Sequence, residues 1–112
     1  MIGELVYLAS PYSHPDPVIK EQRYRDALKV LADLTKSGVV AYSPIVHSHP
    51  MARDHDLAGD WKFWDQIDRV FLSRCSKMIV VKLGGWDVSI GVRDEITIAL
   101  NFGIPIQYME VK

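Results

Sequence analysis

The chain has 112 residues, of which 48% are hydrophobic and 24% charged, close to the average composition of soluble globular proteins. Thirteen Lys and Arg residues against fourteen Asp and Glu residues give a formal charge of −1, so neither a nucleic acid polymer nor a membrane surface is expected as a partner. The single cysteine, Cys75, excludes an intramolecular disulfide and a cysteine-rich zinc site. No apolar run reaches the length of a membrane span and no signal-peptide pattern opens the chain, so we expect one cytoplasmic domain over residues 1–112.

Short apolar runs alternate along the chain with longer segments of helical periodicity. The first predicted helix has Asp16 as its capping residue and Pro17 at its first position, and Gly38 ends it. Asp60 is expected to cap the second helix. The sequence thus predicts strands at 5–9, 39–42, 78–81 and 104–108, helices at 17–37, 60–75 and 88–102, and a long polar loop at 43–59.

Alternation of strands and helices of this length requires parallel strands joined by right-handed crossovers. We therefore expect a three-layer α/β/α fold of the Rossmann or flavodoxin-like kind, with a four-stranded, mostly parallel sheet. The first strand is expected at its centre, and the last at an edge because of Pro105.

Ligands of such sheets bind outside the carboxyl ends of the strands. The segments that follow the first three strands are 10–17, 43–59 and 84–89, and they should meet at one site. Their candidate substrate-binding residues are Ser10, Pro11, Tyr12, His47, His49 and Trp86.

Glu95 is an acid on a helix stripe that should be apolar. Its neighbours at helical spacing include Val92, Ile98 and Ala99, so the carboxylate is directed toward the core, where a buried charge is costly unless it is paired. Gly91, one turn earlier, leaves room for a ligand on the same face. The alternative is a rotated stripe, with Ile96 and Leu100 facing the core and Glu95 at its margin.

Asp68 is a second acid in apolar surroundings, because Trp64, Phe71 and Leu72 lie at helical spacing from it. It either serves chemistry or is tied to a loop N–H or to an arginine such as Arg25 or Arg93. Two such acids facing one sheet suit glycosidic chemistry, in which one carboxylate attacks the anomeric carbon and another polar group handles the proton.

The segment that precedes Glu95 contains Gly85 and Ser89 at a predicted helix start. Free backbone N–H groups and the Ser89 hydroxyl there can hold a phosphate or a sugar hydroxyl, although Ser89 or Asp87 can equally serve as a helix cap. The spacing of His47 and His49 does not match a zinc site, so no metal is expected. Glycosidic chemistry by carboxylates requires no organic cofactor either.

Motifs along nearly the whole chain resemble the nucleoside 2-deoxyribosyltransferase-like superfamily, which includes 2′-deoxynucleoside 5′-phosphate N-hydrolases. The segment 6–12, Val-Tyr-Leu-Ala-Ser-Pro-Tyr, is similar to the family's opening strand. Asp68, eight residues before Ser76, resembles the family's aspartate segment, which usually has Asp where Ser76 stands. The pattern Ser-x-Gly-x-x-x-Glu over 89–95, with Gly-Ile-Pro at 103–105, resembles the family's catalytic helix. The pattern is most similar to a short bacterial and phage branch.

The resemblance implies a role for each matching residue. Glu95 falls on the catalytic nucleophile, Tyr7 on the tyrosine beside it, Asp68 on the residue that handles the base or leaving group, and Ser89 on the position that holds a 5′-phosphate or a hydroxyl. The expected activity is cleavage or transfer of the N-glycosidic bond of a 2′-deoxynucleoside or its 5′-monophosphate.

Two alternatives remain open at this point. One is a nucleotide-binding or sensing module without efficient turnover, suggested by the absence of the family's C-terminal extension after the last strand. The other is a glycohydrolase of a dinucleotide such as NAD. A small-molecule nucleoside or nucleotide is the expected ligand in each case. A homo-oligomer is expected because relatives complete their pockets across subunits.

Overall fold

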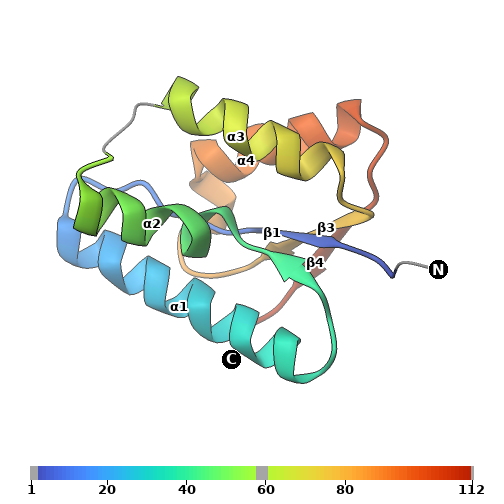
Figure 1. Cartoon of the computed structure of the whole chain (residues 1–112), viewed down its shortest axis with the longest axis horizontal. Helices are drawn as coiled ribbons and strands as arrows, with labels where there is room; N and C mark the ends of the chain where they lie inside the picture. Colours follow the sequence, from blue (N-terminus) through green and yellow to red (C-terminus); the bar gives the residue numbers. More distant parts are fainter. Residues whose placement is uncertain (1–2, 58–60, 112) are drawn as a thin grey trace.

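The computed structural model describes residues 3–57 and 61–111. Strands and helices alternate along the chain, with one additional helix between the second and third strands (Figure 1). The elements are β1 (Val6–Ala9), α1 (Pro17–Lys36), β2 (Ala41–Tyr42), α2 (Pro44–His55), α3 (Trp61–Ser73), β3 (Lys77–Val81), the short 3₁₀ helix η1 (Trp86–Val88), α4 (Ile90–Asn101) and β4 (Ile106–Met109).

The four strands form one sheet in the order β2-β1-β3-β4, and every pair is parallel. In the register, Tyr7 of β1 lies beside Tyr42 of β2 and Met78 of β3. The expected α/β fold with a central first strand is confirmed. The last strand lies at an edge, and Pro105 directly precedes it.

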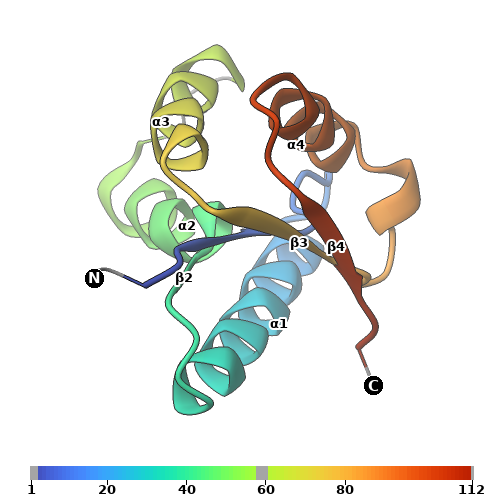
Figure 2. The same ribbon diagram turned by 90° about the vertical axis from the view of Figure 1, so that its right-hand side faces the viewer.

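Helices cover both faces of the sheet, which gives the expected three layers. Figure 2 shows α3 and α4 on one face and α1 on the other. Because side chains alternate along a strand, Tyr7 and Ala9 of β1 enter the core under α3 and α4, whereas Val6 and Leu8 pack against α1. No helix in the described part of the chain combines the length and apolarity needed to cross a membrane.

The prediction of a polar loop over 43–59 is wrong, because α2 occupies most of that segment. Ser43 caps this helix by accepting a hydrogen bond from the Val46 N–H (3.2 Å), and Pro44 fills the first helical position. The helix continues through Pro50 and ends at Asp56, which has a left-handed backbone (φ 57°). His47 and His49 are therefore helical residues. The expected Asp60 cap lies outside the described residues.

Side chains also cap α1 and α4. Asp16 accepts a hydrogen bond from the Val18 N–H (2.9 Å) at the start of α1, as expected. Ser89 accepts one from the Val92 N–H (3.2 Å) at the start of α4. The third predicted helix therefore starts two residues later than expected, because η1 precedes it.

Candidate active site

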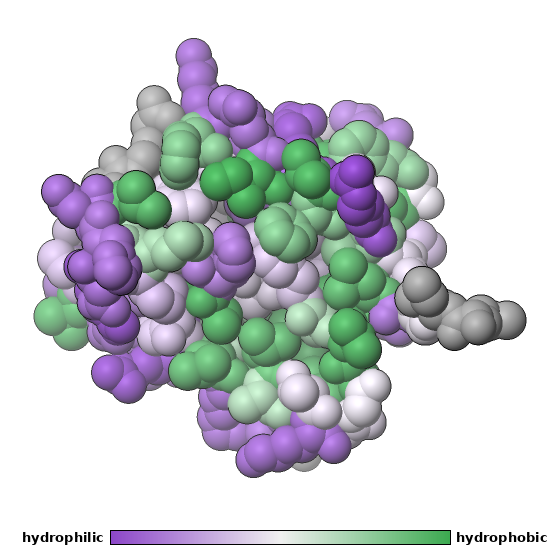
Figure 3. Space-filling model, viewed as in Figure 1, coloured by the Kyte–Doolittle hydropathy of each residue, from purple (hydrophilic) through white to green (hydrophobic). Residues whose placement is uncertain are grey.

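A cavity of about 520 Å³ opens where β1 ends, and we call it the central cavity. Its wall is formed by Tyr7 of β1, the loop after β1, the first turns of α1, and parts of α2, α3 and α4. Figure 3 shows hydrophilic residues mainly around the edge of the α2 and α3 side of the molecule, with hydrophobic and weakly polar residues across its centre. Eight of the eleven candidate residues from the sequence line the central cavity: Tyr7, Ser10, Tyr12, His49, Asp68, Ser89, Gly91 and Glu95.

Glu95 enters the cavity from α4, on the side of the helix that faces the core. Val92 and Ala99 on the same stripe are buried, whereas Leu100 is 66% exposed, so the rotated alternative is wrong. The fully buried Tyr7 hydroxyl donates a hydrogen bond to Glu95 Oε2 (2.5 Å). Burial raises the pKa of Glu95 to about 8, the Tyr7 hydrogen bond opposes that rise, and the nearby Asp68 adds to it.

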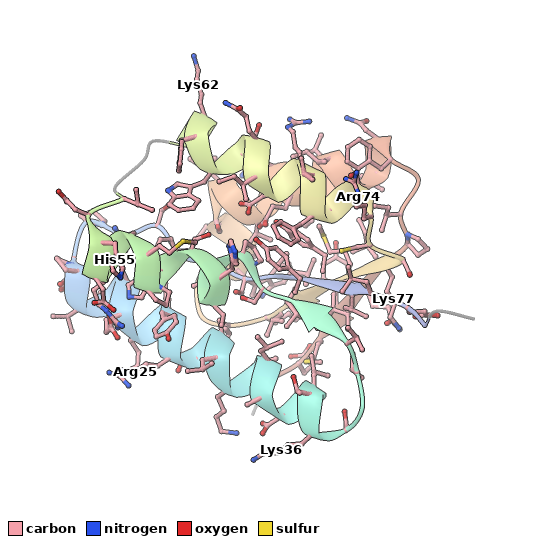
Figure 4. All side chains as sticks on the ribbon, viewed as in Figure 1. Arg25, Lys36, His55, Lys62, Arg74 and Lys77 are labelled. Carbon is pink, nitrogen blue, oxygen red and sulfur yellow. The ribbon has the colours of Figure 1, made fainter. Side chains whose placement is uncertain are left out.

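Asp68 enters the same cavity from α3. Burial raises its pKa to about 7, Asp65 adds to the rise, and the Tyr42 hydroxyl opposes it. Asp68 Oδ1 is buried and has no hydrogen-bond partner among the described residues. Arg25 does not supply one, since it pairs with Glu21 (3.5 Å) and points away from α3 (Figure 4). A hydrogen bond from a ligand would satisfy Oδ1.

The two carboxyl groups interact, because the charge of Asp68 raises the pKa of Glu95. Like charges in a partly desolvated site do not both ionise at neutral pH without cost. Together the two groups retain a proton near pH 7. One carboxylate and one carboxylic acid are the pair that a nucleophile with a proton donor requires.

The start of α4 forms another part of the wall. Ser89 and Gly91 line the cavity, and a Cβ atom placed on Gly91 would meet only Ser89 Oγ (3.8 Å) within 4 Å, apart from its own helix backbone and chain neighbours. The space beside Gly91 is therefore open. The Ser89 hydroxyl also serves as the cap of α4, so its structural role accompanies whatever contact it makes with a ligand.

Tyr12 and His49 lie in a hydrogen-bonded cluster between the loop after β1, α1 and α2. The Tyr12 hydroxyl lies 2.6 Å from His49 Nδ1, and His49 Nε2 lies 2.7 Å from Glu21 Oε1. Arg53 donates a hydrogen bond to Glu21 Oε2 (3.0 Å). His49 is only 6% exposed.

Three sequence candidates lie outside the cavity wall. Pro11, in the loop after β1, is buried and is not among the residues that line the cavity. His47, on the other side of α2 from the cavity, packs against Tyr42, with ring centroids 5.5 Å apart. Trp86 lies on η1 against Tyr108 of β4 (5.7 Å between ring centroids). We therefore assign no ligand contact to these three residues.

Sequence reasoning missed several residues of the wall. Asp65 lines the cavity while paired with Arg69 (2.8 Å). Asp94 and Glu21 also line it. The residues of α2 were missed as a group, and the one signal for them was the Ser43-Pro44 pair, which repeats the Asp16-Pro17 pattern of a helix start.

Comparisons with known proteins place this arrangement in a family. A family model described as a domain of unknown function (DUF1937) matches residues 4–111. No curated protein matches the sequence. The solved structure of a 2-deoxyribosyltransferase from Bacillus psychrosaccharolyticus is similar, with a TM-score of 0.63 at 19% identity over 95% of this chain and 72% of that one. The expected resemblance is confirmed at the level of the fold. The chain therefore belongs to the DUF1937 family and has the fold of a 2-deoxyribosyltransferase.

Proposed function

We propose that this protein is an enzyme that cleaves or transfers the N-glycosidic bond of a 2′-deoxynucleoside or its 5′-monophosphate. The observation that carries the proposal is the Glu95 carboxyl group, held 2.5 Å from the Tyr7 hydroxyl in a cavity that Asp68 also lines. The fold supports it, since the similar solved structure is a 2-deoxyribosyltransferase described as a biocatalyst for nucleoside synthesis.

In the first step, a Glu95 oxygen attacks the anomeric carbon while the bond from that carbon to the base nitrogen breaks. The electron pair of that bond goes to the base, and the proton of Asp68 neutralises it. Tyr7 holds the attacking carboxylate in position through its hydrogen bond. The product is a covalent deoxyribosyl ester of Glu95 and a free base.

In the second step, water or the nitrogen of another base attacks the anomeric carbon of the ester. Asp68, ionised after the first step, accepts the proton of the attacking group. The carbon–oxygen bond to Glu95 breaks, and the carboxylate is regenerated. Water gives hydrolysis and a base gives transfer, with the same residues in both reactions.

Ser89, Gly91 and the first turn of α4 hold the sugar end of the substrate in this proposal. Free N–H groups at a helix start bind anionic oxygens, and the open space beside Gly91 admits them. The roles assigned to Ser10, Tyr12 and His49 are contacts with the remainder of the substrate, since they line the same cavity.

The test is the Glu95→Gln variant in a base-release assay with deoxynucleosides and their 5′-monophosphates. The amide keeps the size of the side chain and can accept the Tyr7 hydrogen bond but does not act as a nucleophile, so we expect release to fall by a factor of at least about 10³. Asp33→Asn, which removes an exposed carboxylate of α1 paired with Lys29, is the matched control. Full activity in a folded Glu95→Gln variant contradicts the proposal. Saturable binding by the unmodified chain without base release favours a sensing module instead.

A further inference from the structure

The hydrogen-bonded chain Tyr12–His49–Glu21 has no role in the two-step reaction, yet it lines the central cavity. Its members come from the loop after β1, from α2 and from α1, so the fold brings together three segments that are distant in sequence. Distances of 2.6 Å and 2.7 Å join them in series. Each ring nitrogen of His49 faces one of the two partners, so the nitrogen that carries the hydrogen determines which group donates in each hydrogen bond.

The charge of Glu21 determines which nitrogen of His49 carries the hydrogen. The hydrogen bond from His49 and the charge of Arg53 lower the pKa of Glu21, so this carboxylate is ionised and only accepts hydrogen bonds. His49 Nε2 must then carry a hydrogen toward Glu21, and in the tautomer with its one ring hydrogen on Nε2 the other nitrogen, Nδ1, is an acceptor. Burial raises the pKa of Tyr12, so its hydroxyl stays protonated and donates its one hydrogen to Nδ1. The Tyr12 oxygen can therefore only accept from any further partner.

Packing keeps both rings in place. Tyr24 stacks on the His49 ring with centroids 4.6 Å apart, and the Tyr12 ring meets the edge of the same ring at 5.5 Å. The Lys20 ammonium lies 5.3 Å from the centre of the Tyr12 ring. A group restrained in this way loses little freedom when it binds a ligand.

Two other buried hydroxyls in the same wall have no partner among the described residues, namely those of Ser10 and Ser48. Buried polar groups are otherwise almost always hydrogen-bonded in folded proteins. Their presence beside Tyr12 indicates that this part of the cavity receives a polar ligand group.

We propose that Tyr12, oriented by His49 and Glu21, is a specificity-determining residue whose oxygen accepts a hydrogen bond from an N–H or O–H group of the bound nucleoside. The inference rests on the proposed function, because it takes a nucleoside as the ligand. The donor is either the exocyclic amine of the base or a hydroxyl of the sugar, and the experiment separates these sources.

The experiment measures binding by calorimetry in the Glu95→Gln protein, which keeps the ligand intact. The ligands are 2′-deoxyadenosine and three analogues that lack, respectively, the 6-amino group, the 3′-hydroxyl and the 5′-hydroxyl. We expect Tyr12→Phe to weaken binding of 2′-deoxyadenosine roughly tenfold and to leave unchanged the affinity for the one analogue that lacks the donor. Tyr108→Phe, which removes a hydroxyl from β4 at a distance from the cavity, is the matched control.

Glu21→Gln supplies a second, independent readout. A neutral amide both donates and accepts, so it no longer fixes the protonated nitrogen of His49, and binding of the same ligands should weaken. In a Tyr12→Phe background this substitution should have no further effect, because both act through one hydroxyl. Equal loss for all four ligands, or none, overturns the inference while nucleoside binding still supports the proposed function. Failure of the parent protein to bind any of the four overturns the inference, whereas the proposed function is decided by the base-release assay.

Discussion

At the scale of single residues, the candidate site is defined by acids whose surroundings oppose their ionisation. Glu95 and Asp68 lie on facing helices, and burial raises the pKa of both. Carboxyl groups perturbed by burial in a cavity are frequent in active sites, and purely structural acids are usually paired. Asp65 illustrates the contrast, because it forms an ion pair with Arg69, whereas Oδ1 of Asp68 has no hydrogen-bond partner among the described residues.

The two raised pKa values predict a bell-shaped dependence of kcat/KM on pH. Below the pKa of Asp68, about 7, both carboxyl groups are protonated and no nucleophile exists. Above the pKa of Glu95, about 8, both are ionised and no proton donor remains. Between these values the pair holds one proton, mostly on Glu95 because its pKa is the higher, and the reacting form is the minor one in which Glu95 is ionised and Asp68 is protonated. That form is a fixed share of the singly protonated pair, so the maximum should lie between the two values, as initial rates in a series of buffers would show. Asp68→Asn should remove the alkaline limb and lower the rate, and a maximum well below the lower value would contradict the assignment.

The free energy of unfolding should also depend on pH, through the ionisation of Glu95. The pKa of Glu95 rises from 4.5 in an ordinary carboxyl to about 8 in the folded chain, so between these values the folded state binds more protons than the unfolded state. The free energy of unfolding therefore falls as pH rises through this window. Glu95→Gln removes the effect, and we expect it to exceed the unmodified chain in stability by at least about 1 kcal/mol above pH 8, with a smaller difference below pH 5. Urea unfolding at the two extremes measures this, and an equal difference at both would be the contrary result.

At the scale of elements, the strands and three of the helices could be predicted because their patterns follow the burial that the fold requires. β1 and residues 78–81 of β3 are continuous apolar runs, as expected for strands covered on both faces. On α1, Val30, Leu31 and Leu34 likewise pack against apolar side chains of the sheet. An element that packs against a hydrophobic core carries an apolar pattern in its sequence, which is why these elements could be predicted.

Helix α2 could not be predicted in the same way because its inner stripe faces a cavity. Ile45, Ser48, His49, Ala52 and Arg53 lie on one side at helical spacing and line the central cavity. Ser48, His49 and Arg53 are polar, because this side of the helix faces an open cavity and not a packed core, so the apolar periodicity that indicates a helix is weak. Pro50 in the interior of the helix also argues against it. The part of the site that sequence reasoning missed is largely the part that α2 contributes.

Ser89 offers a prediction at the element scale, because a helix cap and a phosphate contact respond differently to substitution. Asp is as good an N-cap as Ser, so Ser89→Asp should keep the stability of the chain within about 0.5 kcal/mol, whereas Ser89→Ala should lower it by about 1 kcal/mol. The added carboxylate repels a phosphate group. We expect Ser89→Asp to raise KM for a 5′-monophosphate at least about tenfold while KM for the nucleoside changes little. Steady-state kinetics with both substrates decide this, and an unchanged KM for the monophosphate would place the phosphate elsewhere.

At the scale of the whole molecule, the order of the strands determines where the site lies. After β1 the chain continues to β2 on one side of it, and after β3 it continues to β4 on the opposite side. The loops that follow β1 and β3 therefore diverge between these two central strands. Open parallel sheets bind ligands at this position. The location of the site was therefore predictable from topology, whereas the partners of each side chain depend on packing that no single sequence reveals.

We also predict that the molecule self-associates through the layer of α3 and α4. The layer formed by α3 and α4 leaves large apolar side chains exposed, with Val70 at 56% and Leu100 at 66%. A stable interface buries about 800 Å² on each partner, a modest share of the 7118 Å² surface of this chain. We expect light scattering to give a mass of two chains or more, falling on dilution, and Leu100→Lys to shift the protein toward the monomer because a charge at the interface is costly to desolvate. Val40→Lys, which changes a 64% exposed residue just before β2, should leave the mass unchanged. An active protein that has the mass of one chain at every concentration would show that the cavity is complete within a single subunit.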